Sequence, residues 1–205
     1  MAATLEKRRR LRPEQRRELI VEAAAGEFGR RGHRNARLAD IAMAAGTTKA
    51  VIYDHFENKG ALHAEVVTRA SKDLVAAVAE AVIGCEGEGR ERYRAGLLAG
   101  FRLIEQRPDV RTLLLGEPGA DAQVAKASMR AQREARAAMA QLYMSEPSFL
   151  ARHPRRRERA EQIAQGGIGA INGFAVLGVE DGLSPERLAD LAMDLLWPGI
   201  EALIR

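Results

Sequence analysis

The stretch LADIAMAAGTTKAVIYDHFENKGAL, residues 38–62, decides the fold of this chain. Its first part carries apolar residues at helical spacing, namely Ile41, Ala42 and Ala45. Gly46 is the residue type that readily adopts positive φ and ends a helix, and Thr48 is of the type that accepts a backbone N–H at the start of the next one. The pattern predicts two short helices joined by a tight turn, followed at once by a longer helix from Lys59.

The second of these helices, Lys49 to Phe56, has two unlike faces. Ile52 and Phe56 lie four residues apart and are expected to point into the core. The remaining faces carry Lys49, Ala50, Val51, Tyr53, Asp54 and His55. A short helix that follows a tight turn and presents such a face predicts a helix-turn-helix, whose second helix lies in a DNA major groove.

The exposed face of this helix divides into expected base contacts and expected backbone contacts. Lys49 can donate to O6 and N7 of guanine, while Ala50 and Val51 can touch thymine methyl groups. Asp54 would repel phosphate, so it is expected to accept from a cytosine amino group or to orient a basic neighbour. The rest of the expected interface comprises Thr47 and Thr48 in the turn, and Arg37, Tyr53, His55 and Lys59 at the phosphates.

A wider pattern surrounds this motif and covers about the first third of the chain. Its members are Arg17, Ile20, Ala23, Ala24, Phe28, Gly32, Asp40, Ile41, Ala42, Ala45, Gly46, Tyr53, His55, Phe56, Lys59 and Leu62. The pattern resembles the N-terminal domain of the tetracycline-repressor (TetR) family of transcriptional regulators. Ala36 and Arg37 depart from it, since such proteins usually carry Ser or Thr there, and Asn35 is the residue expected to cap the helix at Leu38 instead.

The charge of the 205-residue chain is unevenly distributed. Residues 1–60 hold 13 Lys and Arg against 8 Asp and Glu, whereas residues 61–205 hold 19 against 20. A basic first segment joined to a nearly neutral remainder favours a nucleic-acid contact at one end. The arginines at positions 8–12 form either a solvated tail or an arm that binds phosphate.

Enzyme and metal chemistry find little support in the sequence. The four histidines, His33, His55, His63 and His153, form no pair at metal-ligand spacing, and His63 is expected to be exposed. The glycines at 166, 167, 169 and 173 fit neither a dinucleotide fingerprint nor a P-loop, and they are interpreted as a helix face that allows close packing. No nucleophile, base and acid stand at a spacing typical of catalysis. We therefore predict no enzyme activity, no metal and no cofactor.

The sequence also indicates a compartment. Cys85 is the sole cysteine, so no intrachain disulfide can form and an oxidising compartment is not favoured. No apolar run is long enough to cross a bilayer, and the charged N-terminus lacks the apolar segment of a secretory signal. The expected location is the cytoplasm.

Helical periodicity continues through the rest of the chain, and no long stretch alternates with period two. The sequence predicts an all-α fold of about nine helices. Expected helices after the head cover 59–83, 110–115, 120–144, 154–179 and 185–204, with another between Gly89 and Pro108, while the first helix runs from Pro13 to Gly32. We expect a helix-turn-helix DNA-binding domain at 1–60 and a helical ligand-binding and dimerisation domain at 61–205.

The resemblance implies a small-molecule cavity enclosed by the middle helices. Candidate lining residues are Phe101, Ile104, Leu114, Met139, Tyr143, Phe149, Phe174 and Trp197. Each of them also suits an ordinary apolar core, and no buried charge identifies a ligand class.

The last two helices carry more apolar surface than a single antiparallel pair needs to bury. Two such pairs from two chains would form a four-helix bundle, which is also where dimers of the resembled family form. The expected interface residues are Ile163, Gly169, Gly173, Leu177, Leu188 and Leu195. The alternative is that these helices pack only within their own chain.

These features together lead to three functional hypotheses. The first is a homodimeric, ligand-responsive repressor of transcription that binds a pseudo-palindromic DNA operator. The second is a regulator with the same fold but no small-molecule effector, controlled by a protein partner or by its own abundance. The third is a helical enzyme or carrier whose N-terminal pattern is incidental. The sequence identifies neither an operator nor an effector.

Overall fold

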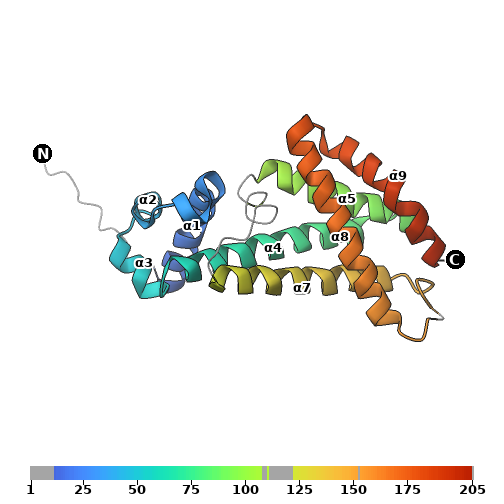
Figure 1. Ribbon diagram of the computed structural model, residues 1–205, viewed down its shortest axis with the longest axis horizontal. Coiled ribbons are helices and arrows are strands. Elements are labelled where there is room, and N and C mark those ends of the chain that lie inside the picture. The colour runs from blue at the N-terminus through green and yellow to red at the C-terminus, as the bar shows by residue number, and fades with distance from the viewer. Residues whose placement is uncertain (1–11, 108–109, 111–121, 152, 205) are drawn as a thin grey trace, which may run out of the picture.

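The structure, a computed structural model, describes residues 12–107, 110, 122–151 and 153–204. Within these ranges every regular element is an α-helix, which confirms the all-α prediction (Figure 1). The helices are α1 (Pro13–Asn35), α2 (Leu38–Ala44), α3 (Lys49–His55), α4 (Lys59–Gly84), α5 (Gly89–Gln106), α7 (Ala122–Met144), α8 (Arg156–Asp181) and α9 (Pro185–Ile204). Apart from Val110, the helix expected at 110–115 lies outside the described residues, and so do residues 1–11.

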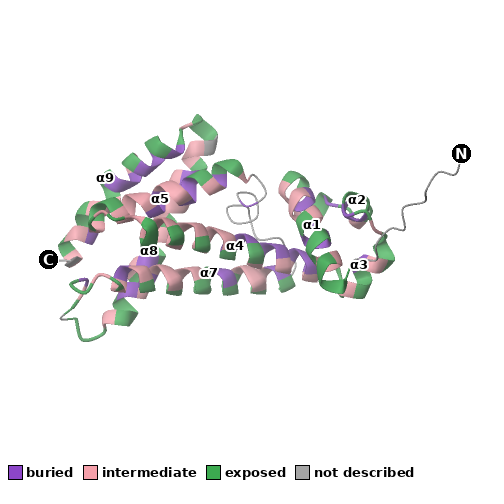
Figure 2. Ribbon diagram, turned by 180° about the vertical axis from the view of Figure 1, so that it is seen from behind, coloured by how far each residue is buried: buried purple, intermediate pink, exposed green. Residues whose placement is uncertain are grey.

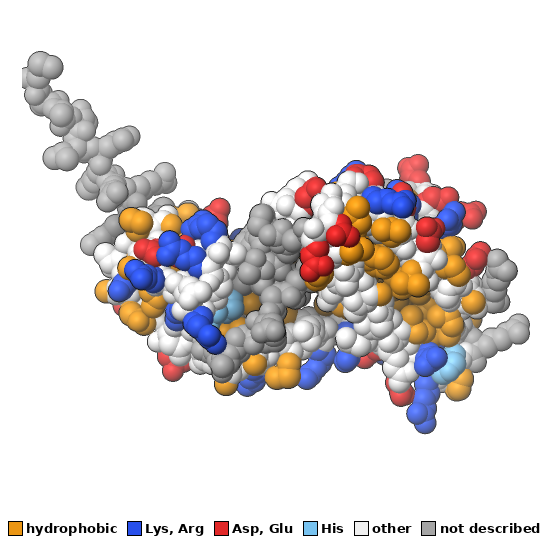
Figure 3. Space-filling model, turned by 45° about the horizontal axis from the view of Figure 1, so that its top comes forward, with side chains coloured by type: hydrophobic (Ala, Val, Ile, Leu, Met, Phe, Trp, Pro, Cys, Tyr) orange, Lys and Arg blue, Asp and Glu red, His pale blue; other side chains and the backbone are white. Residues whose placement is uncertain are grey.

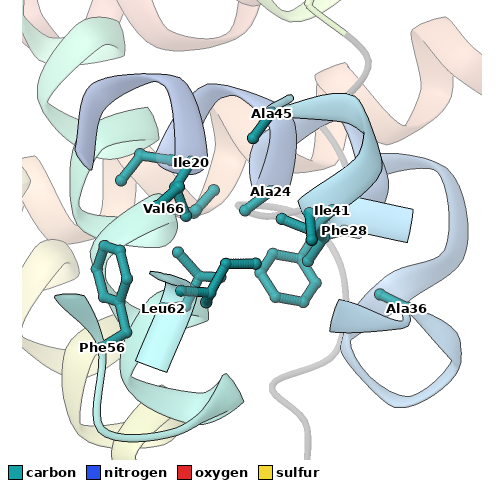
Figure 4. Packing of buried hydrophobic residues seen from close by; sticks show 12 residues of the cluster. Ile20, Ala24, Phe28, Ala36, Ile41, Ala45, Phe56, Leu62 and Val66 are labelled. Carbon is teal, nitrogen blue, oxygen red and sulfur yellow. The ribbon is translucent and has the colours of Figure 1, made fainter. Parts of the chain in front are cut away.

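Helices α1, α2 and α3 pack around one apolar cluster together with the start of α4, and we call this unit the head (Figure 4). Its most deeply buried large side chains are at most 1% exposed: Ile20, Phe28, Ile41, Ile52 and Leu62. Burying a side chain of this size contributes about 1.5–3 kcal/mol relative to leaving it in water. All four helices supply members of this set, so the start of α4 is part of the head's core.

The junction between α1 and α2 differs from the sequence-based expectation. Gly32 does not end α1 but kinks it, with φ of 69°, and the helix continues to Asn35. Asn35 therefore does not cap α2, and that prediction is wrong. Arg37 occupies the N-cap position without a side-chain hydrogen bond, while its carbonyl oxygen accepts the N–H groups of Asp40 and Ile41 at 3.0 and 3.2 Å.

The remaining helices form an elongated body beside the head, with α4 running through both (Figure 1). Helix α4 packs against α5 and α7, α7 packs against α8, and α5 packs against α9. Buried positions follow the inward faces of these helices, while their outer faces are exposed (Figure 2). Because α4 contributes Leu62 and Val66 to the head and Leu74 to the body, it connects the two mechanically. None of the described helices is long and apolar enough to cross a membrane.

Two apolar clusters hold the body together. One joins α5 to α8 and α9 and includes Leu97, Phe101 and Leu188. The other joins the end of α7 and the following loop to α8 and α9, and includes Tyr143 and Phe149. Trp197 packs against both clusters, so the only tryptophan of the chain reports on the interior of the body.

Arg156 closes the loop between α7 and α8. Its Nε donates to the carbonyl oxygen of Phe149 at 2.8 Å, and its Nη2 lies within hydrogen-bond distance of the carbonyl oxygens of Met144, Glu146 and Pro147, at 3.2, 3.0 and 3.4 Å. Carbonyl groups at the end of a helix have no partner within that helix. The guanidinium group of Arg156 therefore supplies hydrogen-bond donors to carbonyl oxygens at the end of α7 and in the loop that contains the buried Phe149.

We expect Arg156→Ala to lower the free energy of unfolding by about 2 kcal/mol or more, since hydrogen bonds to charged groups contribute about 1.5–3 kcal/mol. The matched control is Arg157→Ala, whose side chain is 80% exposed and makes only a 3.5 Å ion pair with Glu161. Chemical denaturation followed by helical circular dichroism measures both. Equal stability of the two variants would show that the Arg156 contacts do not support the fold.

Candidate nucleic-acid interface and body cavity

The turn before α3 fixes the direction of that helix. Gly46 adopts φ of 60°, and the N–H of Thr47 donates to the carbonyl oxygen of Ala42 at 2.9 Å. Thr48 is the N-cap of α3, as predicted, and its Oγ1 accepts the N–H of Val51 at 3.4 Å. Ile52 then anchors the inner face of α3, being 1% exposed. The turn and the buried side chain hold α3 at the end of the molecule remote from the body (Figure 1).

The outer face of α3 is open to solvent. Exposed residues on it are Lys49, Ala50, Tyr53 and Asp54, while Val51 and His55 are half-buried. In the preceding turn Thr48 is exposed and Thr47 is half-buried, and Arg37 is exposed at the start of α2. The large ring of Tyr53 is 54% exposed, which is unusual for an aromatic side chain without a partner surface. The structure therefore leaves the outer face of α3 open to solvent, and contact of the predicted residues with DNA stays a prediction.

Lys59 has a structural contact that the sequence did not indicate. Its Nζ donates to the carbonyl oxygen of Arg34 at 3.3 Å and thus ties the start of α4 to the end of α1. Partial burial lowers the pKa of Lys59 from its ordinary value. An ammonium group has three donors, so this contact leaves capacity for a phosphate.

Arg17 fixes the position of α3 from the side of α1. Its guanidinium carbon lies 4.7 Å from the centroid of the Phe56 ring, and its Nη1 lies 3.2 Å from Oε1 of Glu65 on α4. The hydrogen bond from Arg17 lowers the pKa of the Glu65 carboxyl. Because Phe56 is the C-cap of α3, Arg17 holds the end of α3 against α4. The sequence pattern includes Arg17 but does not indicate this role.

His63 is buried, so the prediction that it is exposed is wrong. Its ring stacks on that of His33 with centroids 4.8 Å apart and an angle of 9°, and it lies 4.4 Å from the centroid of Phe28. His33 reaches this position because the kink at Gly32 turns the last residues of α1 toward α4. The three rings thus pack the second half of α1 against the start of α4.

The body contains a cavity of about 170 Å³ bounded by α4, α5, α7, α8 and α9. Five of the candidate residues line it: Ile104, Met139, Tyr143, Phe149 and Trp197. Phe101 and Phe174 belong instead to the apolar cluster between α5, α8 and α9, and Leu114 lies outside the described residues. The structure adds Tyr93 to the wall, with its hydroxyl oxygen 3.4 Å from that of Tyr143. Binding of a ligand by these residues stays a prediction.

No group of three or more His, Cys, Asp or Glu residues with metal-binding geometry occurs in the part of the chain that the structure describes. The half-buried thiol of Cys85 lies in the connection between α4 and α5.

The expected dimer residues fall into two groups. Leu195 is 64% exposed, and Gly169 and Gly173 are exposed with nothing within 4 Å of an added Cβ, so these positions are open to a partner. Leu188, by contrast, is 5% exposed and packs inside its own chain, where a Cβ added at Gly178 would lie 2.5 Å from its Cδ1. Leu188 therefore contributes to packing within its own chain, and its part in a dimer stays a prediction.

Ile163 and Leu177 are half-buried, and Ile163 packs against the cluster at the end of α7. The exposed Val176 extends the open face of α8, with 41% of its surface accessible. Figure 3 shows hydrophobic side chains gathered on the body, whereas basic side chains are prominent on the head. The outer faces of α8 and α9 thus carry the small and apolar surface that an association of two chains would bury.

Comparison with known proteins gives matches along the N-terminal part of the chain. The family model described as bacterial regulatory proteins of the tetR family matches residues 20–66. The HTH-type transcriptional activator FasR of Mycolicibacterium smegmatis is 36% identical over 96 residues, which cover 47% of this chain and 43% of FasR. The HTH-type transcriptional repressor SCO4008 of Streptomyces coelicolor is 41% identical over 66 residues, which cover 32% of this chain and 34% of that protein. The chain therefore spans less than half the length of these curated relatives.

The fold is shared over a much longer range. A TetR-like transcriptional regulator from Rhodococcus sp. RHA1 superimposes with a TM-score of 0.67 at 24% identity, covering 94% of this chain and 99% of that one. At this identity the likeness concerns the fold alone. Residues 20–66 thus match the tetR family of bacterial regulatory proteins, and the described chain shares its fold with this solved TetR-like regulator.

Proposed function

We propose that this chain is a homodimeric DNA-binding transcriptional regulator that acts as a repressor and is released from a pseudo-palindromic operator by a small molecule. The observation that carries the proposal is the open outer face of α3. The capped turn before α3, its buried inner face and the contact of Arg17 with Phe56 hold this helix in place. A short, rigidly held helix with exposed Lys49, Ala50 and Tyr53 suits a major groove. The matched relatives are named as transcriptional regulators, which supports the same role here.

DNA binding and effector binding are proposed for two parts of the chain that α4 connects. Residues 1–60 would bind DNA, and residues 61–205 would bind the effector and the second chain. Leu62 and Val66 of α4 belong to the core of the head, while Leu74 and Val78 further along line the body cavity. A ligand that fits the cavity better when α4 is displaced would change the spacing of the two heads and lower operator affinity. A coupling of about 1–3 kcal/mol is typical of such linkage.

The cavity also separates this proposal from its main alternative, a regulator without a small-molecule effector. An apolar cavity of about 170 Å³ against the helix that carries the head is unnecessary for a protein controlled only by abundance. Release of bound operator by a cavity ligand would support the first hypothesis. Release by a protein partner alone would support the second.

The experiment that tests the proposal is a titration of the dimeric protein with the DNA that flanks its own gene and with unrelated DNA, followed by fluorescence anisotropy. Specific sites are expected to bind about 10³-fold or more tightly than unrelated DNA, and both affinities should fall as salt rises. Equal affinity for both DNAs would exclude a sequence-specific regulator of the flanking region. No binding at low salt would support an incidental resemblance.

We expect Tyr53→Phe and Lys59→Ala to weaken binding to operator and unrelated DNA alike. A phosphate contact carries no base preference, and removal of one cationic group should reduce the salt slope by about one unit in Lys59→Ala. The control is Lys126→Ala, which removes an exposed lysine from α7 in the body. Because Lys59 also binds the Arg34 carbonyl, thermal unfolding of each variant must accompany the titrations. Unchanged affinity and slope in both variants would remove these residues from the interface.

Side chains that contact bases should affect sequence preference, unlike side chains that contact phosphates. Lys49→Ala and Val51→Ala should alter preference at particular half-site positions, by about 1–3 kcal/mol for each well-formed interaction with a base that the substitution removes. Selection from randomised DNA, followed by sequencing, measures this directly. Identical preferences for wild type and both variants would mean that α3 does not read bases through these side chains.

A further inference from the structure

The wall of the body cavity is apolar except for a few polar groups, and the most deeply placed of these are two phenols. Tyr93 of α5 and Tyr143 of α7 lie with their hydroxyl oxygens 3.4 Å apart. Tyr143 is 7% exposed, and a Cβ added at Gly167 of α8 would lie 3.1 Å from its hydroxyl oxygen. Glycine at that position thus leaves room for the hydroxyl group beside α8. Trp197 lies on the same wall, with its ring centroid 6.0 Å from that of Tyr93.

The two phenols leave one donor for a ligand. Each hydroxyl group has one proton, and either oxygen can be the donor in the contact between them. One O–H is therefore used within the pair, while the other remains available. Burial raises the pKa of Tyr93 and of Tyr143, so both stay protonated at neutral pH. The pair can donate to a carbonyl, ether or hydroxyl oxygen but brings no charge to the cavity.

The two charged side chains of the cavity wall each make hydrogen bonds within the protein. Arg92, in the first turn of α5, donates from Nε to the carbonyl oxygen of Val82 at 3.3 Å. Glu146, just beyond α7, accepts the N–H and the hydroxyl of Ser148 at 3.4 and 2.9 Å. These two side chains have opposite charges and are half-buried. An ion placed beside the tyrosines would exchange its hydration for mainly apolar contacts, which is costly.

Two further polar groups of the wall are uncharged as well. The Ser145 hydroxyl donates to the carbonyl oxygen of Leu142 at 2.6 Å, and the Asn172 amide of α8 is neutral. The size of the cavity is also informative. An engineered apolar cavity of about 150 Å³ in another protein binds benzene, so 170 Å³ accommodates one or two small rings.

We propose that the body cavity takes a compact, uncharged, mainly apolar molecule of about one or two rings, held by a hydrogen bond from the Tyr93–Tyr143 pair to an oxygen acceptor on the ligand. This inference rests on the proposed effector role of the cavity and adds its chemical class. The tyrosine pair discriminates acceptors from plain hydrocarbons, and the mainly apolar wall discriminates neutral molecules from ions.

The test uses three probes with the same ring and different polar groups: cyclohexyl methyl ketone, cyclohexanecarboxylate and cyclohexylmethylammonium. Binding to the full-length protein is measured by isothermal titration calorimetry and by the emission of Trp197, the only tryptophan. The ketone should bind about tenfold or more tightly than either ion. The doubly substituted Tyr93→Phe, Tyr143→Phe protein should bind the ketone about three- to tenfold more weakly, which is the usual effect of removing one hydrogen bond, whereas each single variant keeps one O–H that can donate.

Thr68→Val serves as the control, since it removes a hydroxyl that donates to the Ala64 carbonyl within α4 and does not line the cavity. It should leave ketone binding unchanged. Tighter binding of either ion than of the ketone would overturn the proposal, and so would binding of none of the three probes. Equal ketone affinity in wild type and in the doubly substituted Tyr93→Phe, Tyr143→Phe protein would remove the tyrosine pair from recognition. DNA titrations without probe are run in parallel, so failure of ligand binding is distinguished from failure of the regulator itself.

Discussion

Gly173→Leu is expected to give a folded monomer that has lost specific DNA binding. Nothing outside the adjoining turns of α8 lies within 4 Å of a Cβ at this position in the single chain, so the new side chain begins in open space. Leucine also favours a helix over glycine by about 0.8–1 kcal/mol. Destabilisation of the monomer is therefore not expected, and any loss must arise between two chains.

The expected effect on DNA binding is large because one head makes few contacts. Nonspecific affinities are about 10⁻⁴–10⁻⁶ M at physiological salt, whereas specific complexes reach about 10⁻⁸–10⁻¹¹ M. Loss of the second head should thus weaken operator binding by about 10³-fold or more, while weak nonspecific binding remains. Leu195→Asp, which places a charge on a side chain that is 64% exposed in the monomer, should act in the same way.

Two matched controls keep this prediction specific to the α8–α9 face. Gly84→Leu makes the same change at the end of α4, also in open space, and Met129→Asp places the same charge on an exposed side chain of α7. Both variants should remain dimeric and bind operator normally. Sedimentation velocity and thermal unfolding of all four proteins separate dissociation from misfolding. A dimeric Gly173→Leu protein with wild-type operator affinity would locate the interface elsewhere.

Phe28→Ala should cause the largest loss of stability, and the loss should be confined to the head. Phe28 has no exposed surface and packs against both rings of the His33–His63 stack. Removing a phenylalanine side chain from a close-packed core costs about 3–5 kcal/mol, which is comparable to the stability of a small domain. DNA binding should be lost, because α3 depends on the same core.

Trp197 makes this prediction directly measurable. It lies in the body, so its emission reports on the body alone, while helical circular dichroism reports on the whole chain. In Phe28→Ala the helical signal should decrease at temperatures where Trp197 emission is unchanged. A single concerted transition at the wild-type temperature would show that the aromatic cluster does not support the head.

The helix-turn-helix could be predicted residue by residue because its determinants are local. The positive φ of Gly46, the capping by Thr48 and the burial of Ile52 follow from residue type and spacing over fewer than ten positions. The start of α9 at Ser184 and Pro185 was likewise predictable, and the Ser184 hydroxyl accepts the N–H of Arg187 at 3.3 Å.

The errors concern contacts between residues far apart in the chain. His63 stacks on His33 only because Gly32 redirects the end of α1, and nothing in the local pattern reveals that meeting. Arg156 satisfies carbonyl groups of a preceding helix, so its partners cannot be read from the basic run that contains it. Side-chain spacing predicts which residues share one face of a helix. It does not predict which residues of other helices that face contacts.

The two leucines of α9 illustrate the same limit. Leu188 and Leu195 are seven residues apart and share one nominal face of the helix. Helices α8 and α9 diverge from their connection at 182–184, so Leu188 packs against Gly178 of α8 whereas Leu195 remains exposed (Figure 1). The crossing of two helices is a tertiary property, which explains why spacing alone does not separate the buried leucine from the exposed one. Phe101 and Phe174 were placed at the cavity for the same reason, since periodicity does not separate cavity wall from packed core.

Binding of a specific operator by two chains can be tested by nuclease footprinting on the DNA that flanks the protein's own gene. The footprint is combined with sedimentation of the isolated protein–DNA complex. We expect a protected pseudo-palindrome whose half-sites lie one helical turn or a multiple apart, bound by an even number of chains, with protection lost in Gly173→Leu. Tight protection of a single site by a clean monomer would contradict the account.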